Sequence, residues 1–241
     1  MLRQLGVMAG ANDPSATGPA PALLRFVVAM LGKRWHADRP VIVKANVPVN
    51  FIAARVLALD PLAPAIMLHF PLANYVAAIL RTDGHVRWTE NVFAELRIGE
   101  SRYSAVAPPQ TAAEKAAALW FTQMKAFESL LQTYAGVRSL EASMLFDRPA
   151  ETVLAAAGLL ELDMSDVEAR QISAGELFRS YSKNPALDYD PEVRTAREAE
   201  AMRRLEREIE QARAWAEAAG ERHGLPAALD RPLLGEPTPL L

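Results

Sequence analysis

The sequence predicts an α/β fold with a parallel sheet, and three observations lead to this prediction. Two short apolar segments, 41–44 and 65–68, have the composition of buried strands, and a helical pattern follows each of them. This alternation is typical of parallel βαβ units, whose right-handed crossover places the carboxyl ends of both strands at one edge of the sheet. The length of 241 residues and the 51% hydrophobic content suit one globular domain with a sizeable core.

The composition excludes several classes of function. The chain has no cysteine, so it can form no disulfide, thiolate nucleophile or iron–sulfur cluster. Its four histidines are scattered without ligand spacing, so we expect no metal site. A net charge of −3 argues against a nucleic-acid partner. The most apolar stretch, 22–31, contains Arg25 and is too short to cross a bilayer, so we expect no membrane contact and a cytoplasmic location.

Local signals place the elements along the chain. Prolines and Gly18 predict a loop over 11–21, and further prolines separate the first strands and helices. The expected elements then follow in this order: a helix at 22–33, a strand at 41–44, a helix at 49–59, a strand at 65–68, a helix from Pro71, a long helix after Thr111, a strand at 140–146, a helix at 147–160, a polar loop at 171–189 and a final helix from Asp190.

The long central helix has the clearest signals. Thr111 and Glu114 match a capping box, in which a hydroxyl and a carboxylate satisfy free backbone amides at the helix start. Gly136 supplies the stop. Between them, apolar residues recur at spacings of four and three: Trp120, Met124, Phe127, Leu131 and Tyr134. We interpret this stripe as core packing rather than as a cofactor site.

The final helix is heavily charged, with eight Glu and seven Arg between residues 192 and 222. Its narrow apolar stripe favours a terminal helix that docks on the domain by one face, and a coiled-coil partner helix is the alternative. We therefore divide the chain into a domain at 1–222 and a Pro-rich tail at 223–241. We expect the tail to be extended and mobile.

Candidate site residues fall where strands are expected to end. Ligands of open parallel sheets bind at the carboxyl ends of the strands, and Lys44, Asn46 and His69 lie there in this interpretation. Lys44 closes an apolar strand, where a cation is costly unless it reaches water or an anion. Other interpretations stay open: His69 as a satisfied histidine at a strand end, and Asn46 as the cap of the next helix. Likewise Arg179 and Lys183 are either anion contacts or solvated loop charges.

These segments, in this order, resemble the sulfotransferase family. Val43-Lys44-Ala45-Asn46-Val47-Pro48 is similar to that family's strand and Lys-x-His-x-Pro turn, and residues 66–77 resemble its next strand, turn and Ser-bearing helix. Residues 144–159 resemble a late strand–helix segment, and 178–183 a basic Ser-Lys loop. The resemblance implies a P-loop NTPase-like fold, whose first strand and phosphate loop we would expect before Leu2. It also implies transfer of a sulfuryl group from 3′-phosphoadenosine 5′-phosphosulfate to a hydroxyl or amine of a small-molecule or glycan acceptor.

The resemblance assigns roles to individual residues. It makes Lys44 and Asn46 catalytic, and it makes four further residues contacts of the nucleotide: His69, Arg179, Ser182 and Lys183. Asn46 stands where the family has a catalytic His, and an amide cannot take a proton near neutral pH. His69 stands where the family has an Arg. Residues 82–110 correspond to variable acceptor loops, and their aromatic residues form either a hydrophobic wall or part of the core.

Three hypotheses follow from this pattern. The chain is a fragment of an active sulfotransferase, or its start is misplaced. Alternatively it is a non-catalytic, sulfotransferase-like binding or scaffold protein that associates through its charged C-terminal helix. The third hypothesis is a helical interaction protein unrelated to the family. Because the missing first strand is normally central, we also expect an exposed sheet edge, and a homo-oligomer formed through that edge or through the C-terminal helix.

Overall fold

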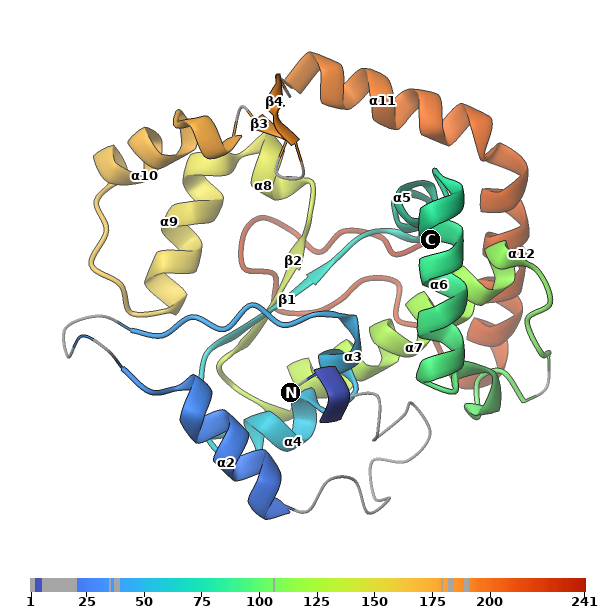
Figure 1. Ribbon diagram of the computed structural model, residues 1–241, viewed down its shortest axis with the longest axis horizontal. Coiled ribbons are helices and arrows are strands. Elements are labelled where there is room, and N and C mark those ends of the chain that lie inside the picture. Colours follow the sequence, from blue (N-terminus) through green and yellow to red (C-terminus); the bar gives the residue numbers. More distant parts are fainter. Residues whose placement is uncertain are drawn as a thin grey trace.

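The computed structural model describes residues 3–5, 21–34, 36, 40–105, 107–178, 180–181, 184–188 and 191–241. The architecture is mixed α/β and mostly helical, with a small parallel sheet near the centre of the view in Figure 1. The expected α/β class is therefore confirmed, although the parallel sheet has only two strands in the described part of the chain. Among the described residues, no helix combines the length and the apolar character that crossing a membrane requires.

The central sheet pairs two segments that lie far apart in sequence. Strand β1 (Ala65–His69) runs parallel to β2 (Val137–Glu141), and the register places Ala65 beside Val137 and His69 beside Glu141. The strand expected at 65–68 is thus confirmed. The strand expected at 41–44 is wrong: these residues belong to no strand in the structure and are exposed to solvent. A strand needs a neighbouring strand as its hydrogen-bonding partner. Residues 41–44 have none among the described residues, because β1 pairs with β2 and not with them.

The first half of the chain supplies short helices around this sheet. In order they are α2 (Pro21–Leu31), α3 (Val47–Asn50), α4 (Ala53–Leu57), α5 (Leu72–Ile79) and α6 (Asp83–Glu95), followed by a 3₁₀ turn, η1 (Ile98–Glu100). The single helix expected at 49–59 is two helices, because the backbone leaves helical geometry at Ile52, where φ is −117° and ψ is 4°. Helix α6 was not expected; Thr82 caps it by accepting a hydrogen bond from the amide of His85.

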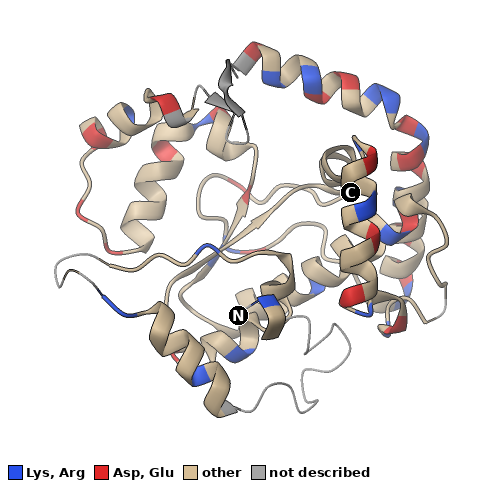
Figure 2. Cartoon of the chain, in the orientation of Figure 1, with Lys and Arg blue, Asp and Glu red and all other residues tan. Residues whose placement is uncertain are grey.

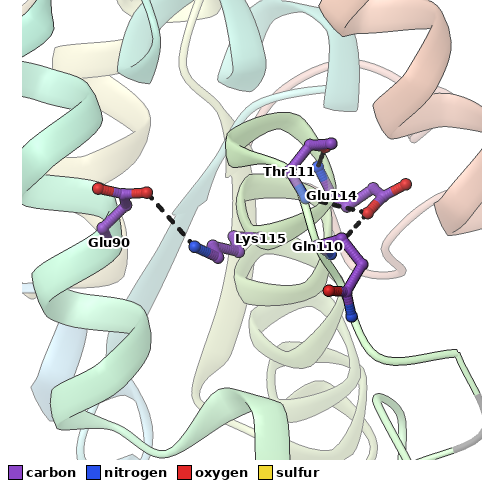
Figure 3. A network of polar contacts seen from close by, with 5 residues as sticks. All are labelled: Glu90, Gln110, Thr111, Glu114 and Lys115. Carbon is purple, nitrogen blue, oxygen red and sulfur yellow. Dashed lines mark hydrogen bonds and ion pairs between the residues drawn. The ribbon is translucent and has the colours of Figure 1, made fainter.

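Helix α7 (Ala112–Thr133) forms the centre of the core. The capping box is confirmed: the Glu114 carboxylate accepts hydrogen bonds from the amides of Gln110 at 2.6 Å and Thr111 at 3.1 Å, as Figure 3 shows. One turn on, Lys115 Nζ lies 3.3 Å from Glu90 Oε1 of α6 and ties the two helices together. Four residues of the stripe interpreted as core packing are buried: Trp120, Met124, Phe127 and Leu131. The fifth, Tyr134, is half-buried and forms the C-cap, so the helix ends before the Gly136 stop that the sequence predicts.

The segment after β2 differs from the strand expected at 140–146. The strand ends at Glu141, and α8 (Met144–Asp147) begins three residues later. The reason is a local turn, because the Glu141 carboxylate accepts hydrogen bonds from both the amide and the hydroxyl of Ser143. The remaining elements are α9 (Pro149–Leu159), α10 (Asp166–Ser173), η2 (Glu176–Phe178), the antiparallel pair β3 (Ser180–Tyr181) and β4 (Asn184–Asp188), α11 (Pro191–Arg204) and α12 (Glu206–His223).

The expected final helix is divided at Leu205 into α11 and α12. Helix α12 buries Ala212, Trp215, Ala216 and Ala219, and it packs on α7 and α5. This confirms a terminal helix docked by one face. Helix α11, in contrast, is exposed on all sides between residues 195 and 200, and Figure 2 shows Lys or Arg and Asp or Glu residues along it.

The Pro-rich tail, expected to be mobile, is packed in the structure. Leu229 and Leu240 are buried in the main core. The amide of Ser139 in β2 donates to the carbonyl of Arg231, and the amide of Leu233 donates back to Ser139. Proline keeps this segment out of regular structure, as expected, but its leucines and backbone groups still find partners on the folded domain.

Candidate functional site

His69 occupies the carboxyl end of β1 and is the sequence-predicted site residue that the structure places in the interior. Ala65, Met67 and His69 share one face of the strand because side chains alternate, and Ala65 and Met67 pack against the main core. His69 is 5% exposed, and neither ring nitrogen has a hydrogen-bond partner among the described residues. Burial lowers the pKa of the imidazole below its usual value, while the nearby backbone of Met67, the Glu141 carboxylate and the backbone of Leu140 act in the opposite direction.

Glu141 is the register partner of His69 and was missed by sequence reasoning. The Glu141 side chain accepts the Ser143 amide at 3.0 Å and the Ser143 hydroxyl, so its carboxylate is held at the end of β2. The carboxyl ends of two parallel strands therefore bring an acid, a hydroxyl and an imidazole to one edge of the sheet. The available signal was the polar pair Glu141 and Ser143, two residues apart, but the strand expected at 140–146 left no turn at this position.

Lys44 and Asn46 lie on the surface, in the segment that leads into α3. Both are exposed, and no described hydrogen bond or ion pair joins either side chain to His69. Asn46 is the N-cap residue of α3 by position, and its carbonyl accepts the Val49 amide at 2.9 Å. Its side chain makes no capping hydrogen bond. The structure thus does not bring the two predicted catalytic residues to the buried imidazole.

The other predicted contacts of the nucleotide lie outside the described residues: Arg179, Ser182 and Lys183. A buried cation not identified from sequence lies close to α8. Arg194 of α11 is 8% exposed, donates to Asp147 Oδ1 at 3.2 Å, and places its guanidinium carbon 4.5 Å from the centre of the Phe146 ring. An acid and an aromatic face therefore already engage this guanidinium.

The turn after β1 is tied down by two hydrogen bonds from distant elements. Trp120 Nε1 donates to the carbonyl of Phe70 at 2.9 Å, and the amide of Leu72 donates to the carbonyl of Leu240 at 2.8 Å. Leu72 is the first residue of α5, and first-turn amides are the groups that bind anions at helix N-termini. The tail carbonyl therefore satisfies the first of these amides.

A buried polar chain connects three helices on the core side of this turn. Asn50 Nδ2 donates to Gln123 Oε1 at 2.9 Å, and Gln123 Nε2 donates to the hydroxyl of Tyr75 at 3.3 Å. Burial raises the pKa of the Tyr75 phenol well above its usual value, so the phenol stays protonated at neutral pH. The chain fixes α3, α7 and α5 relative to one another, and it supplies no proton acceptor to the site.

The described surface hollows lie elsewhere. One, of about 500 Å³, lies between α12 and the tail, and its walls include Glu217, Glu221 and Leu225. A second, of about 480 Å³, lies along α11 beside Thr195 and Ala199. Neither is lined by Lys44, Asn46 or His69. The described residues contain no cluster of three or more His, Asp or Glu side chains that could hold a metal ion.

Comparison with known proteins identifies no relative of this chain. No protein-family model, no curated protein and no solved structure matches the chain. The sulfotransferase resemblance, the P-loop NTPase-like fold and the nucleotide therefore stay predictions from the sequence motifs, and the structure supplies the geometry on which a functional proposal can be based.

Proposed function

We propose that this chain is a non-catalytic, sulfotransferase-like binding or scaffold protein that associates through its charged C-terminal helix. The buried, unpartnered imidazole of His69 carries this proposal. It stands where the resemblance expects an arginine that holds a phosphate, and a histidine whose pKa is lowered by burial is neutral at pH 7. A neutral, enclosed ring offers neither the charge nor the access that a phosphate ester needs.

The predicted catalytic position supports the same proposal. Asn46 is exposed and carries an amide, which has no basicity near neutral pH, so it cannot activate an acceptor hydroxyl. Helix α11 supplies the associating surface in this proposal, because residues 195–200 are exposed while α12 is buried against α7.

Calorimetry with 3′-phosphoadenosine 5′-phosphate tests the non-catalytic proposal directly. We expect no binding heat at millimolar nucleotide from the complete chain. Saturable heat that disappears in Lys44→Ala, but persists in the matched control Arg25→Ala, would overturn the proposal. Arg25 is suitable because it is also an exposed cation of the N-terminal region, on α2.

A second candidate function is sulfuryl transfer, and the exposure of Lys44 favours it. The ammonium group has no ion-pair partner among the described residues, so it is available to stabilise charge on a transferring sulfuryl group. In this alternative Arg179, Ser182 and Lys183 hold the 3′-phosphate, and a segment outside this sequence completes the nucleotide site. Incubation with labelled 3′-phosphoadenosine 5′-phosphosulfate and a phenol acceptor distinguishes the two, since only a transferase gives a labelled sulfate ester.

A further inference from the structure

Strand β1 has one open edge. The amide of Ala65 donates to Gly136, and the carbonyl of His69 accepts from Ala142, so alternate residues of β1 direct their backbone groups toward β2. The amides and carbonyls of Ile66 and Leu68 therefore face the opposite edge. No described residue forms a backbone hydrogen bond with them there, and Leu68 is 52% exposed.

The other edge of this sheet is closed. On β2, Ser139 directs its backbone groups away from β1 and exchanges hydrogen bonds with Arg231 and Leu233 of the tail. Within the described residues, the outer edge of β1 is thus the only edge of this sheet without backbone hydrogen bonds. An unpaired strand edge is a template for another strand, and proteins usually protect such edges.

The chain also contains a strand-forming segment without a partner. Val41, Ile42 and Val43 have the β-branched side chains that favour strands, and all three are exposed, with Ile42 at 64%. No hydrogen bond is described for the backbone of residues 41–44. The same molecule thus presents an unpaired strand donor and an unpaired strand acceptor.

We propose that two copies of this chain associate by reciprocal strand exchange, in which residues 41–44 of each copy pair with the open edge of β1 in the other. A second copy is the occupant that fits, because it offers both halves of the contact and a two-fold axis makes the two contacts equivalent. Ile42 of one copy and Leu68 of the other then cover apolar surface that each copy alone exposes to water.

A second exposed apolar surface lies on α2, the helix that precedes the donor segment in the chain. Leu23, Phe26 and Met30 are exposed along one face of α2, at spacings of three and four. The opposite face of α2 packs on Val49 and Ile52, which lie five and eight residues after Lys44, the end of the donor segment. This stripe extends the strand contacts toward the roughly 800 Å² per partner that a stable interface buries.

Complementation between two variants tests the exchange. Ile42→Lys damages only the donor and Leu68→Lys only the acceptor, and both positions are exposed, so each variant keeps its fold. In analytical ultracentrifugation we expect each variant alone to dimerise about tenfold or more weakly than the original chain. In a mixture of the two variants, the intact donor segment of the Leu68→Lys chain can pair with the intact β1 edge of the Ile42→Lys chain. Each mixed pair therefore regains one intact contact, and we expect dimers to reappear. Val167→Lys, at a 55% exposed position on α10, is the matched control and leaves dimerisation unchanged.

Engineered cysteines distinguish exchange between copies from pairing within one copy. The chain has no cysteine of its own, so a disulfide in the double variant Ile42→Cys, Leu68→Cys identifies the contact without ambiguity. We expect a covalent dimer under mild oxidation. A monomer with an internal disulfide, or a wild-type chain that stays monomeric at all concentrations, would overturn the proposal. So would a mixture of the two lysine variants that fails to form dimers.

Discussion

Arg231 and Leu131 lie a hundred residues apart in the chain and are joined by a 2.9 Å hydrogen bond from Nη1 of the guanidinium to the backbone carbonyl. The same guanidinium also donates to the carbonyls of Tyr134 and Ala135. Helix α7 ends at this point, where its last carbonyls have no partner within the helix. A cation from the tail therefore caps the central helix, in the position that the helix dipole favours.

Replacing Arg231 with Ala should destabilise the fold. It removes charge-assisted hydrogen bonds to the end of α7, and we expect the free energy of unfolding to fall by about 2–4 kcal/mol in urea denaturation. The free energy of unfolding of Arg231→Lys should lie between those of the original protein and Arg231→Ala, because an ammonium group cannot reproduce the forked donors of the guanidinium. Arg213→Ala, at an exposed position on α12, is the control and should stay within about 0.5 kcal/mol. An Arg231→Ala protein as stable as this control would show that the tail does not anchor α7.

Two glycines should respond to alanine with opposite signs. A methyl group at Gly136 would lie 3.1 Å from the carbonyl oxygen of Ala63 and 3.2 Å from that of Leu62, and backbone cannot easily yield. We expect Gly136→Ala to destabilise the protein by about 1–3 kcal/mol. At Gly158, in α9, no atom from outside its own stretch of helix lies within 4 Å of the added carbon, so Gly158→Ala should stabilise by about 0.5–1 kcal/mol. Thermal melts of both variants give the sign, and a stabilising Gly136→Ala would contradict the close approach.

Removal of the Thr111 hydroxyl tests the capping box of α7. The hydroxyl accepts the Glu114 amide at 3.2 Å, and Thr111→Ala leaves that donor without a protein partner. We expect a loss of about 1 kcal/mol, measured as a shift in the urea midpoint with an unchanged slope. Thr111→Ser retains the oxygen and should lose much less. Equal losses for Ala and Ser would point to the methyl group rather than to the cap.

His69 should make the protein less stable as the pH falls. Its pKa is lowered in the folded state by burial, so the unfolded chain binds the proton more tightly. Stability is therefore full above about pH 6.5 and declines below it, because protonation favours the unfolded state. Urea denaturation between about pH 7.5 and 5.5 should show this slope in the original protein and a flatter one in His69→Gln. A stability that rises toward low pH would mean that the imidazole is charged and paired with Glu141.

Some signals that act within a few residues were interpreted correctly from sequence, whereas the Thr82 cap of α6 and the Glu141–Ser143 turn were missed. The capping box at Thr111 and the apolar spacing after it predicted α7, since both depend on hydrogen bonds and faces within one helix. The strand at 65–68 was likewise correct. The segment 41–44 has the same kind of composition but belongs to no strand, because a strand also requires a neighbour from elsewhere in the chain.

The candidate site shows the same limit. The rule that ligands bind at strand ends led to His69, and the structure places it at the end of a parallel strand. Its neighbour Glu141 could not be predicted, because the register between strands 72 residues apart is decided by packing and not by local pattern. Lys44 and Asn46 depended on the strand that did not form, so they remain on the surface.

The sequence by itself determined the α/β class, the central helix with its N-terminal capping box, and the absence of any cysteine-based chemistry, since these depend on composition and on local hydrogen bonding. Only the tertiary structure decided that β1 pairs with β2, that the Pro-rich tail packs against β2, and that His69 is enclosed. The physical reason is burial and hydrogen bonding at long range: the Arg231 guanidinium donates to the carbonyl of Leu131, and the carbonyl of Leu240 accepts from the amide of Leu72, and the fold brings each pair together from a hundred or more residues apart.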